Sequence, residues 1–127
     1  MKTNLNGAKN AWISSFLGEE VQTVEVEKWD ERRWGKLSEE NMRKKLEFEG
    51  YQVSRYVYPA RTIFPDHSHN NDKKDAVVSG KFKIEVLGQF FLLEAGDMLA
   101  VPAGIVHNAK VIGSESVVSL DAVRAQK

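Results

Sequence analysis

Hydrophobic and polar residues alternate in short runs from residue 51 onward, with turn residues between the runs. In one run Phe82, Ile84 and Val86 fall on one face of an extended chain, while charged residues occupy the positions between them. Gly88 and Gln89 are expected to form the turn that leads into the next run. The predicted strands are Tyr51–Tyr58, Asp75–Ser79, Lys81–Leu87, Phe90–Leu93, Asp97–Val101, His107–Ile112 and Glu115–Val123. About seven short strands at this spacing predict an all-β sandwich, jelly roll or barrel.

The first fifty residues have a different composition. Nine of the twelve glutamates lie there, whereas eleven of the fourteen valines follow later. Ser38, followed by two glutamates, is a typical N-cap, and the spacing after it predicts a helix over Ser38–Glu49. Val24–Val26 is a candidate strand. Because 127 residues suffice for one domain, we expect an N-terminal extension, residues 1–50, that packs on a β-barrel formed by residues 51–127.

Charge and cysteine content narrow the function classes. Eighteen basic and eighteen acidic side chains cancel, and no basic stripe is available for phosphate backbones, so we do not expect nucleic-acid binding. The absence of cysteine excludes disulfides, thiolate metal sites and a cysteine nucleophile, and it is compatible with a reducing compartment. The apolar run Ala11–Leu17 has neither the flanks of a signal peptide nor the length of a membrane span. We expect a cytoplasmic protein without membrane contact.

The three histidines supply the candidate chemistry, and all of them lie in the β-rich part of the chain. In a strand, His67 and His69 would project from the same face, and His107 belongs to a later predicted strand. Three imidazoles that meet are suitable ligands for a divalent transition metal. A His-x-His pair alone more often marks two surface histidines, so the interpretation depends on the residues around His107.

The segment Gly96–His107 carries a glycine, a proline, a second glycine and a histidine at fixed offsets. Here the chain resembles the cupin superfamily, small β-barrels with the motifs G-x5-H-x-H-x3,4-E-x6-G and G-x5-P-x-G-x2-H-x3-N. The second motif is met at four of its five positions, and the family's asparagine is replaced by Val111. The first motif retains its two histidines and its last glycine, Gly80.

The resemblance implies a double-stranded β-helix, the jelly-roll barrel of the cupins, preceded here by a short extension with a helix and a strand. It also implies a divalent transition metal held by His67, His69 and His107 at the barrel mouth. The identity of the metal is open among iron, manganese, nickel, zinc and copper. Small cupins commonly dimerise, so the resemblance further implies a homodimer that binds a small-molecule ligand or substrate.

Two residues depart from the first motif. Arg61 replaces its first glycine, where we expect only an altered turn. Lys73 replaces the glutamate that is a metal ligand in the family. A lysine ammonium cannot bind a cation, and at ~4 Å it repels a positive charge by about 4 kcal/mol at an effective dielectric constant of about 20. Whether metal binds therefore depends on how this lysine is placed.

Several interpretations of Lys73 are open. Asp75 shares its face if the strand has begun there, so it could supply the missing carboxylate ligand or neutralise the lysine. The metal could instead be held by the three histidines and water, as in the three-histidine cupin dioxygenases. Lys73 could also be catalytic, because a buried lysine with a lowered pKa acts as a base or forms a Schiff base. Finally, it could turn outward and pair with Asp72 or Asp75.

Two functional hypotheses follow. The first is a metal-dependent oxygenase or isomerase of a small oxygenated molecule, with open coordination positions that face the barrel cavity. The second is a non-catalytic cupin that binds or senses a small ligand, with a weak metal site or none, and Lys73 favours it. Arg55 or Tyr56, depending on the register of their strand, is expected to line the cavity.

Overall fold

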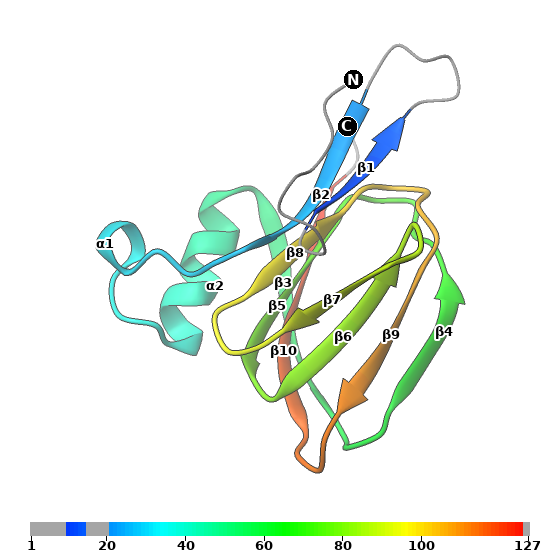
Figure 1. Cartoon of the computed structure of the whole chain (residues 1–127). Coiled ribbons are helices and arrows are strands. Elements are labelled where there is room, and N and C mark those ends of the chain that lie inside the picture. Colours follow the sequence, from blue (N-terminus) through cyan, green and yellow to red (C-terminus); the bar gives the residue numbers. More distant parts are fainter. Residues whose placement is uncertain (1–9, 15–20, 126–127) are drawn as a thin grey trace.

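Two antiparallel β-sheets face each other in the computed structural model, which describes residues 10–14 and 21–125 (Figure 1). In chain order the elements are β1 (Asn10–Ser14), β2 (Val21–Glu27), α1 (Glu31–Trp34), α2 (Glu39–Phe48), β3 (Tyr51–Tyr58), β4 (Ile63–His67), β5 (Lys73–Ser79), β6 (Lys81–Val86), β7 (Gln89–Leu93), β8 (Met98–Val101), β9 (His107–Ile112) and β10 (Val117–Arg124). The larger sheet has the strand order β1-β2-β8-β5-β10-β3, and the smaller sheet has the order β4-β9-β6-β7. The arrangement confirms the predicted all-β jelly roll, with strands and helices ahead of it.

The seven strands predicted after residue 50 all form, with bounds within two residues of the predicted ones, whereas β1 and β4 were not predicted as strands. β3 and β9 have the predicted bounds, and the alternate apolar residues of β6 are buried as expected. Val86 pairs with Gln89, so the turn after β6 begins one residue earlier than predicted. Its two residues, Leu87 and Gly88, have φ values of 54° and 76°. Positive φ at both positions is what the tight turn matching the twist of a hairpin requires.

The hydrophobic core lies between the two sheets. Every second residue of a strand points to the same side, so the inward-facing residues of both sheets meet there. The buried members of this core are Val24, Val77, Phe82, Ile84, Val86, Phe91, Leu93, Leu99, Val101, Ala109, Val111 and Val117. Close packing of these side chains holds the two sheets, and therefore the strand ends that carry the histidines, in a fixed relation.

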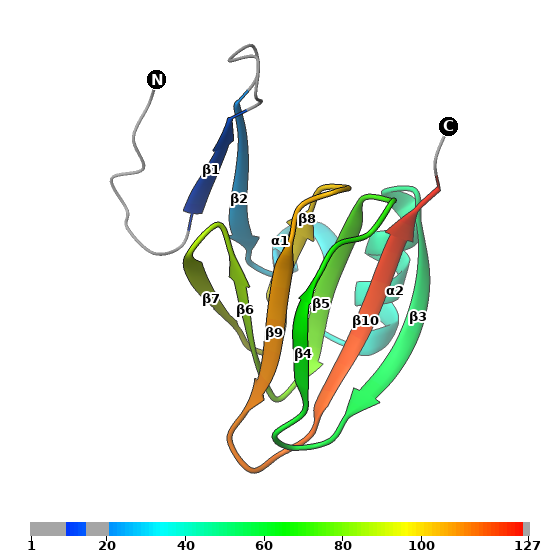
Figure 2. The same cartoon turned by 90° about the vertical axis from the view of Figure 1, so that its right-hand side faces the viewer.

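Helix α2 covers the outer face of the larger sheet (Figure 2). Ser38 caps it as predicted, because its side chain accepts a hydrogen bond from the backbone N–H of Asn41 at 3.0 Å. Met42 and Leu46 of the helix are fully buried. They pack against residues of four strands, namely Tyr51, Ala76, Met98, Leu120 and Ala122. In this region the larger sheet is buried on both faces.

A buried ionic cluster joins β2, the end of α2 and β5. Lys45 Nζ lies 2.6 Å from a carboxylate oxygen of Glu27 and 2.6 Å from one of Glu49. Lys74 Nζ lies 2.8 Å from Glu27 and 3.0 Å from Glu49. Both lysines are buried. Each lysine contacts both glutamates, so positive and negative groups alternate around the cluster and neutralise one another.

Residues 1–50 are described only in part, and their assignment as one extension that packs on the barrel of residues 51–127 stays a prediction. Of the apolar run Ala11–Leu17, residues 11–14 belong to β1, which pairs with β2. The remainder of that run lies outside the described residues. Within the described part of the chain, no helix has the length and apolar character that crossing a membrane requires.

Candidate metal centre

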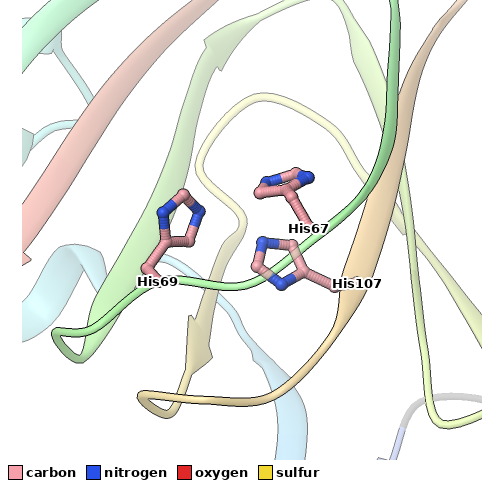
Figure 3. A group of neighbouring side chains, drawn as sticks. All are labelled: His67, His69 and His107. Atoms are coloured by element: carbon pink, nitrogen blue, oxygen red, sulfur yellow. The ribbon is translucent and has the colours of Figure 1, made fainter.

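Three histidines meet at one end of the barrel (Figure 3). His67 is the last residue of β4 and His107 is the first residue of β9, and the two are paired across the ladder. His69 lies in the loop after β4. Its expected position in the same strand as His67 is therefore wrong, because β4 ends where its partner β9 begins. The loop nevertheless brings the third imidazole to the other two.

The spacing of the rings suits one metal ion. A ligand nitrogen can be chosen from each ring so that all three lie within 4.8 Å of one another. The ring centroids are 4.3 Å apart for His67 and His107, 4.8 Å for His67 and His69, and 5.2 Å for His69 and His107. Bonds of about 2.1 Å from a tetrahedral ion place its nitrogen ligands roughly 3.4 Å apart. Small side-chain rotations would therefore bring these rings onto a common ion.

Hydrogen bonds to the backbone select the ring nitrogen that faces a metal. Nδ1 of His67 lies 2.7 Å from the carbonyl oxygen of Pro65, and Nδ1 of His107 lies 3.0 Å from that of Ile105. A carbonyl oxygen only accepts, so each Nδ1 carries the hydrogen and donates it. The lone pair of the neutral ring is then on Nε2. Metal-binding histidines are commonly oriented by such a bond from the other ring nitrogen.

The turn between β8 and β9 connects the two halves of the site. Gly104 donates its backbone N–H to the carbonyl oxygen of His69 at 2.8 Å. Its φ of 82° is a conformation that favours glycine, so this residue permits the corner. Ile105 donates its N–H to the carbonyl oxygen of Pro102 at 3.3 Å and closes the turn. The Pro-x-Gly segment thus holds the loop of His69 as well as the start of β9.

The electrostatic environment keeps two of the imidazoles in the neutral form that binds metals. Burial lowers the pKa of His69, and the positive charge of Lys73 and the proximity of His67 lower it further. Burial also lowers the pKa of His107, against the opposing effect of its bond to the backbone of Ile105. A neutral ring offers its lone pair without first losing a proton.

Lys73 points into the cavity that the histidines border. Its Nζ lies 2.6 Å from Oδ1 of Asp121 on β10, and its side chain is 15% exposed. The interpretation in which Lys73 turns outward and pairs with Asp72 or Asp75 is wrong. β5 begins at Lys73, and the alternation of the strand directs both Lys73 and Asp75 to the cavity. Asp72 instead accepts a hydrogen bond from the backbone N–H of Ala103.

Asp75 is paired with Asp121 across the neighbouring strands β5 and β10. Burial raises the pKa of Asp75 to about 7, and the negative charge of Asp121 and a hydrogen bond between the two carboxyl groups act in the same direction, against the charge of Lys73. Among the described residues, the cluster of ligand atoms within mutual reach consists of the three histidines and does not include Asp75. A ligand role for Asp75 and a catalytic role for Lys73 both stay predictions.

The cavity has a volume of about 140 Å³. Besides the histidines, Lys73 and the two aspartates, it is lined by Tyr58, Phe64, Phe82 and Ala109. Neither of the two residues expected to line it does so. Arg55 forms an ion pair with Glu39 at 2.9 Å, and the side chain of Tyr56 is 47% exposed. The cavity-lining tyrosine is Tyr58, which stacks on Tyr56.

Sequence reasoning missed Tyr58 and Asp121, although Asp121 left a signal. Val117, Ser119 and Asp121 alternate along β10, and the first two are buried. An acidic residue in the inward series of an otherwise apolar strand indicates a partner or a site. Tyr58 left no comparable signal, because a tyrosine at the end of a strand is as common on a surface as in a cavity.

Comparison with known proteins assigns the family. The family model described as Cupin domain matches residues 54–123, which is more than half of the chain. The chain therefore belongs to the cupin superfamily, as its motifs predicted, and its two sheets form the double-stranded β-helix of that family. Among proteins with curated functions, none matches this sequence.

Solved structures share the fold. A cupin superfamily protein from Desulfitobacterium hafniense is 19% identical, with a TM-score of 0.54, and the match covers 61% of this chain and 70% of that one. A conserved protein of unknown function from Streptococcus pyogenes is 19% identical with a TM-score of 0.55, over 61% and 67% of the two chains. A cupin protein from Bacteroides fragilis is 27% identical with a TM-score of 0.51, over 61% and 69%. These likenesses concern the barrel, so the activity has to be argued from the site.

Proposed function

We propose that this cupin holds one divalent transition metal ion on His67, His69 and His107 and uses it in the oxidation or isomerisation of a small oxygenated molecule. The observation that carries the proposal is the approach of one nitrogen from each ring to within 4.8 Å of the other two. The backbone hydrogen bonds that orient two of these rings support it. Iron, manganese, nickel, zinc and copper all accept imidazole ligands, so the ion is proposed as a class.

The ion would act as a Lewis acid that polarises an oxygen atom of the substrate. The residues of the chain would supply open coordination positions on the ion, an apolar wall for the cavity and a group that holds a proton. Three imidazoles leave coordination positions open for water or substrate, the arrangement that distinguishes catalytic from structural sites. Phe64 and Phe82 make part of the cavity wall apolar. Asp75, hydrogen-bonded to Asp121, can hold a proton beside the substrate near neutral pH.

The second candidate function is a cupin that binds or senses a small ligand without catalysis, with a weak metal site or none. Lys73 favours it, because this lysine stands where the cupin motif has its acidic ligand and its charge acts on His69 and His107. The ion pair with Asp121 offsets that charge. We therefore place the metal-dependent function first.

Metal analysis separates the two functions. Protein purified without chelator or polyhistidine tag is expected to contain close to one equivalent of a transition metal, and less than about a tenth of an equivalent would favour the second candidate. His107→Ala is expected to lose the metal and retain the circular dichroism spectrum of a β-barrel. Asn108→Ala is the matched control on β9, because Asn108 contacts Asp66 and Glu85 rather than the histidines, and it is expected to retain the metal. Full metal content in His107→Ala would overturn the ligand assignment.

We also propose that the protein is a cytoplasmic homodimer. The lack of cysteine supports a reducing compartment, and membership of a family whose small members dimerise supports the second subunit. Light scattering tests the assembly directly. The expected mass is twice that of the 14.4 kDa chain, and a monomeric mass at micromolar concentration would contradict the proposal.

A further inference from the structure

The cavity beside the histidines has a polar end with a defined set of charges. Lys73, Asp75 and Asp121 come from β5 and β10 of the larger sheet, and the histidines come from the ends of β4 and β9 and the loop between β4 and β5. The ammonium group of Lys73 has three N–H donors, and the ion pair with Asp121 uses one of them. The lysine is therefore able to bind a further acceptor in the cavity.

The other end of the cavity is aromatic. The centroid of Tyr58 lies 4.8 Å from that of Phe64 and 5.5 Å from that of Phe82, and the two phenylalanines are 6.0 Å apart. The register of the smaller sheet places this cluster deeper than the histidines. Ala109, which pairs with Phe64, follows His107 by two residues and so lies on the same face of β9. A ligand that reaches from the histidines into the barrel therefore passes from polar groups to apolar rings.

The charges at the polar end define the charge of the ligand. The neutral histidines contribute none, Lys73 contributes one positive charge, and the two aspartates together contribute at most two negative charges. A divalent ion on the histidines makes the total at least +1, and it makes the total +2 if the two carboxyl groups share a proton. In both cases the complement is an anion. A second negative charge on the ligand would have to lie against Asp75 and Asp121, so these residues favour an anion with one charge.

The volume of the cavity limits the size of the ligand. It measures about 140 Å³. An apolar cavity of about 150 Å³ in another protein holds one benzene molecule. The space inside the barrel therefore suits a body of a few carbon atoms together with one anionic group, and a sugar, nucleotide or fused-ring acid would have to extend out through the barrel mouth.

We propose that this cavity takes a compact monocarboxylic acid with a short apolar body. Its carboxylate is bound between the metal ion on the histidines and the ammonium group of Lys73, and its apolar body packs against Tyr58, Phe64 and Phe82. This inference rests on the proposed metal centre and names the class of molecule that the centre would act on. It also gives Lys73 a role, which is to bind the anion that a glutamate in its place would repel.

Calorimetric titration of the metal-loaded protein tests the charge requirement. The probes are 3-methyl-2-oxobutanoate, a branched acid of suitable size, and its neutral amide, which has nearly the same shape. The acid is expected to bind at least about tenfold more tightly than the amide, because charge-assisted hydrogen bonds and metal coordination both need the anion. Succinate, with two carboxylates, is expected to bind more weakly than the monocarboxylate.

Two variants test the placement of the ligand. Lys73→Met is expected to weaken binding of the acid about tenfold and to leave binding of the amide unchanged. Lys83→Met is the matched control, because the Nζ of Lys83 lies 4.2 Å from the ring centroid of Phe90, away from the cavity, and it is expected to change neither. Ala109→Leu is expected to fill the cavity and abolish binding of the acid while the metal is retained.

Metal content is measured in each of these samples so that two failures can be told apart. Wild-type protein that accepts no metal would overturn the metal centre and, with it, this inference. Metal-loaded protein that binds acid and amide equally, or that binds neither, would overturn the inference alone. Unchanged binding of the acid by Lys73→Met would also overturn it, because the anion would then be held without the lysine.

Discussion

The Nζ of Lys73 lies 2.6 Å from Oδ1 of Asp121, and this ion pair links β5 to β10 inside the barrel cavity. The lysine occupies the motif position at which the cupin family has an acidic metal ligand. A free ammonium group there would repel a metal ion. Asp121, 48 residues later in the sequence, supplies the compensating negative charge. The pair therefore explains how a three-histidine site can coexist with a lysine in its cavity.

The first prediction concerns removal of this compensation. Asp121→Asn removes the carboxylate that contacts Lys73, although Asp75 keeps part of the compensation because the neighbouring charge that raises its pKa is gone. We therefore expect the affinity for a transition metal to fall by up to about tenfold, a change of ~1.4 kcal/mol. Lys73→Met removes the charge itself and is expected to raise the affinity by a similar factor. Lys73→Glu is expected to raise it further, because it restores the acidic group of the motif. Competition with a chromophoric chelator measures all three affinities.

Lys83→Met serves as the control for these measurements, since it removes a lysine that contacts Phe90 and does not line the cavity. Equal metal affinity in wild type, Asp121→Asn and Lys73→Met would show that the pair has no influence on the ion. Measurement of both metal affinity and carboxylate affinity distinguishes the effect of Lys73→Met from a loss of folding. The variant binds metal more tightly and the acid more weakly, and a general loss of folding would not produce these opposite changes.

The alternation of apolar residues made most of the barrel predictable. Phe82, Ile84 and Val86 identify a strand with one buried face, and the spacing of Gly96–His107 identifies a motif whose turn holds His69. These features are local, because each depends on residues within about a dozen positions of one another. Local patterns are the ones that a single sequence exposes.

The partners across the cavity were not predictable in the same way. The pairing of Lys73 with Asp121 depends on the neighbouring order of β5 and β10, which no local pattern specifies. The nearer acids, Asp72 and Asp75, were the obvious candidates by distance along the chain. Asp72 instead binds the backbone of the turn that follows β8. Contacts of this kind become visible only when the strand order is known.

The second prediction concerns the pH dependence of the ionic cluster. Burial opposes the charged form of Glu27, but hydrogen bonds and charges from Lys45 and Lys74 outweigh burial and lower its pKa from 4.5. Burial likewise opposes the charged form of Lys74, and its bonds to Glu27 and Glu49 raise its pKa from 10.5. The contribution of the cluster to stability is therefore complete between pH 4.5 and pH 10.5. It is lost as pH falls through the lowered pKa of Glu27 or rises through the raised pKa of Lys74.

Urea unfolding of wild type and Glu27→Gln from pH 3 to pH 11 isolates this contribution. We expect the variant to be less stable by about 1–2 kcal/mol near neutral pH, because both lysines keep Glu49 as a partner. The difference is expected to be constant across the middle of the range and to shrink below pH 4.5, where Glu27 becomes protonated first in the unfolded wild type and then, at its lowered pKa, in the folded protein. A difference that grows as pH falls would contradict the assignment.

The third prediction compares two glycines with similar backbone conformations. Gly80 and Gly88 have φ values of 91° and 76°. A Cβ on Gly80 would lie 2.5 Å from the carbonyl oxygen of Ser116, whereas a Cβ on Gly88 would meet nothing within 4 Å. Gly88→Ala is expected to cost only the backbone strain, about 1 kcal/mol. Gly80→Ala adds a clash with backbone and is expected to cost about 3 kcal/mol or more. Chemical denaturation of both variants checks the difference, and equal costs would show that the contact at Ser116 relaxes freely.

The last prediction asks whether residues 1–50 and the barrel unfold as one unit. Leu46 of α2 is fully buried against the larger sheet, so Leu46→Ala is expected to lower the free energy of unfolding by about 2–5 kcal/mol. Lys44→Ala, on the exposed side of the same helix, is the control and is expected to change it by less than about 0.5 kcal/mol.

All three tryptophans lie within the first fifty residues, so tryptophan fluorescence reports on that part, while far-ultraviolet circular dichroism is dominated by the strands of the barrel. If α2 is an integral part of the fold, the two signals change at the same urea concentration in wild type and shift together in Leu46→Ala. A fluorescence transition that precedes the circular dichroism transition would mean that the first fifty residues detach while the barrel remains folded.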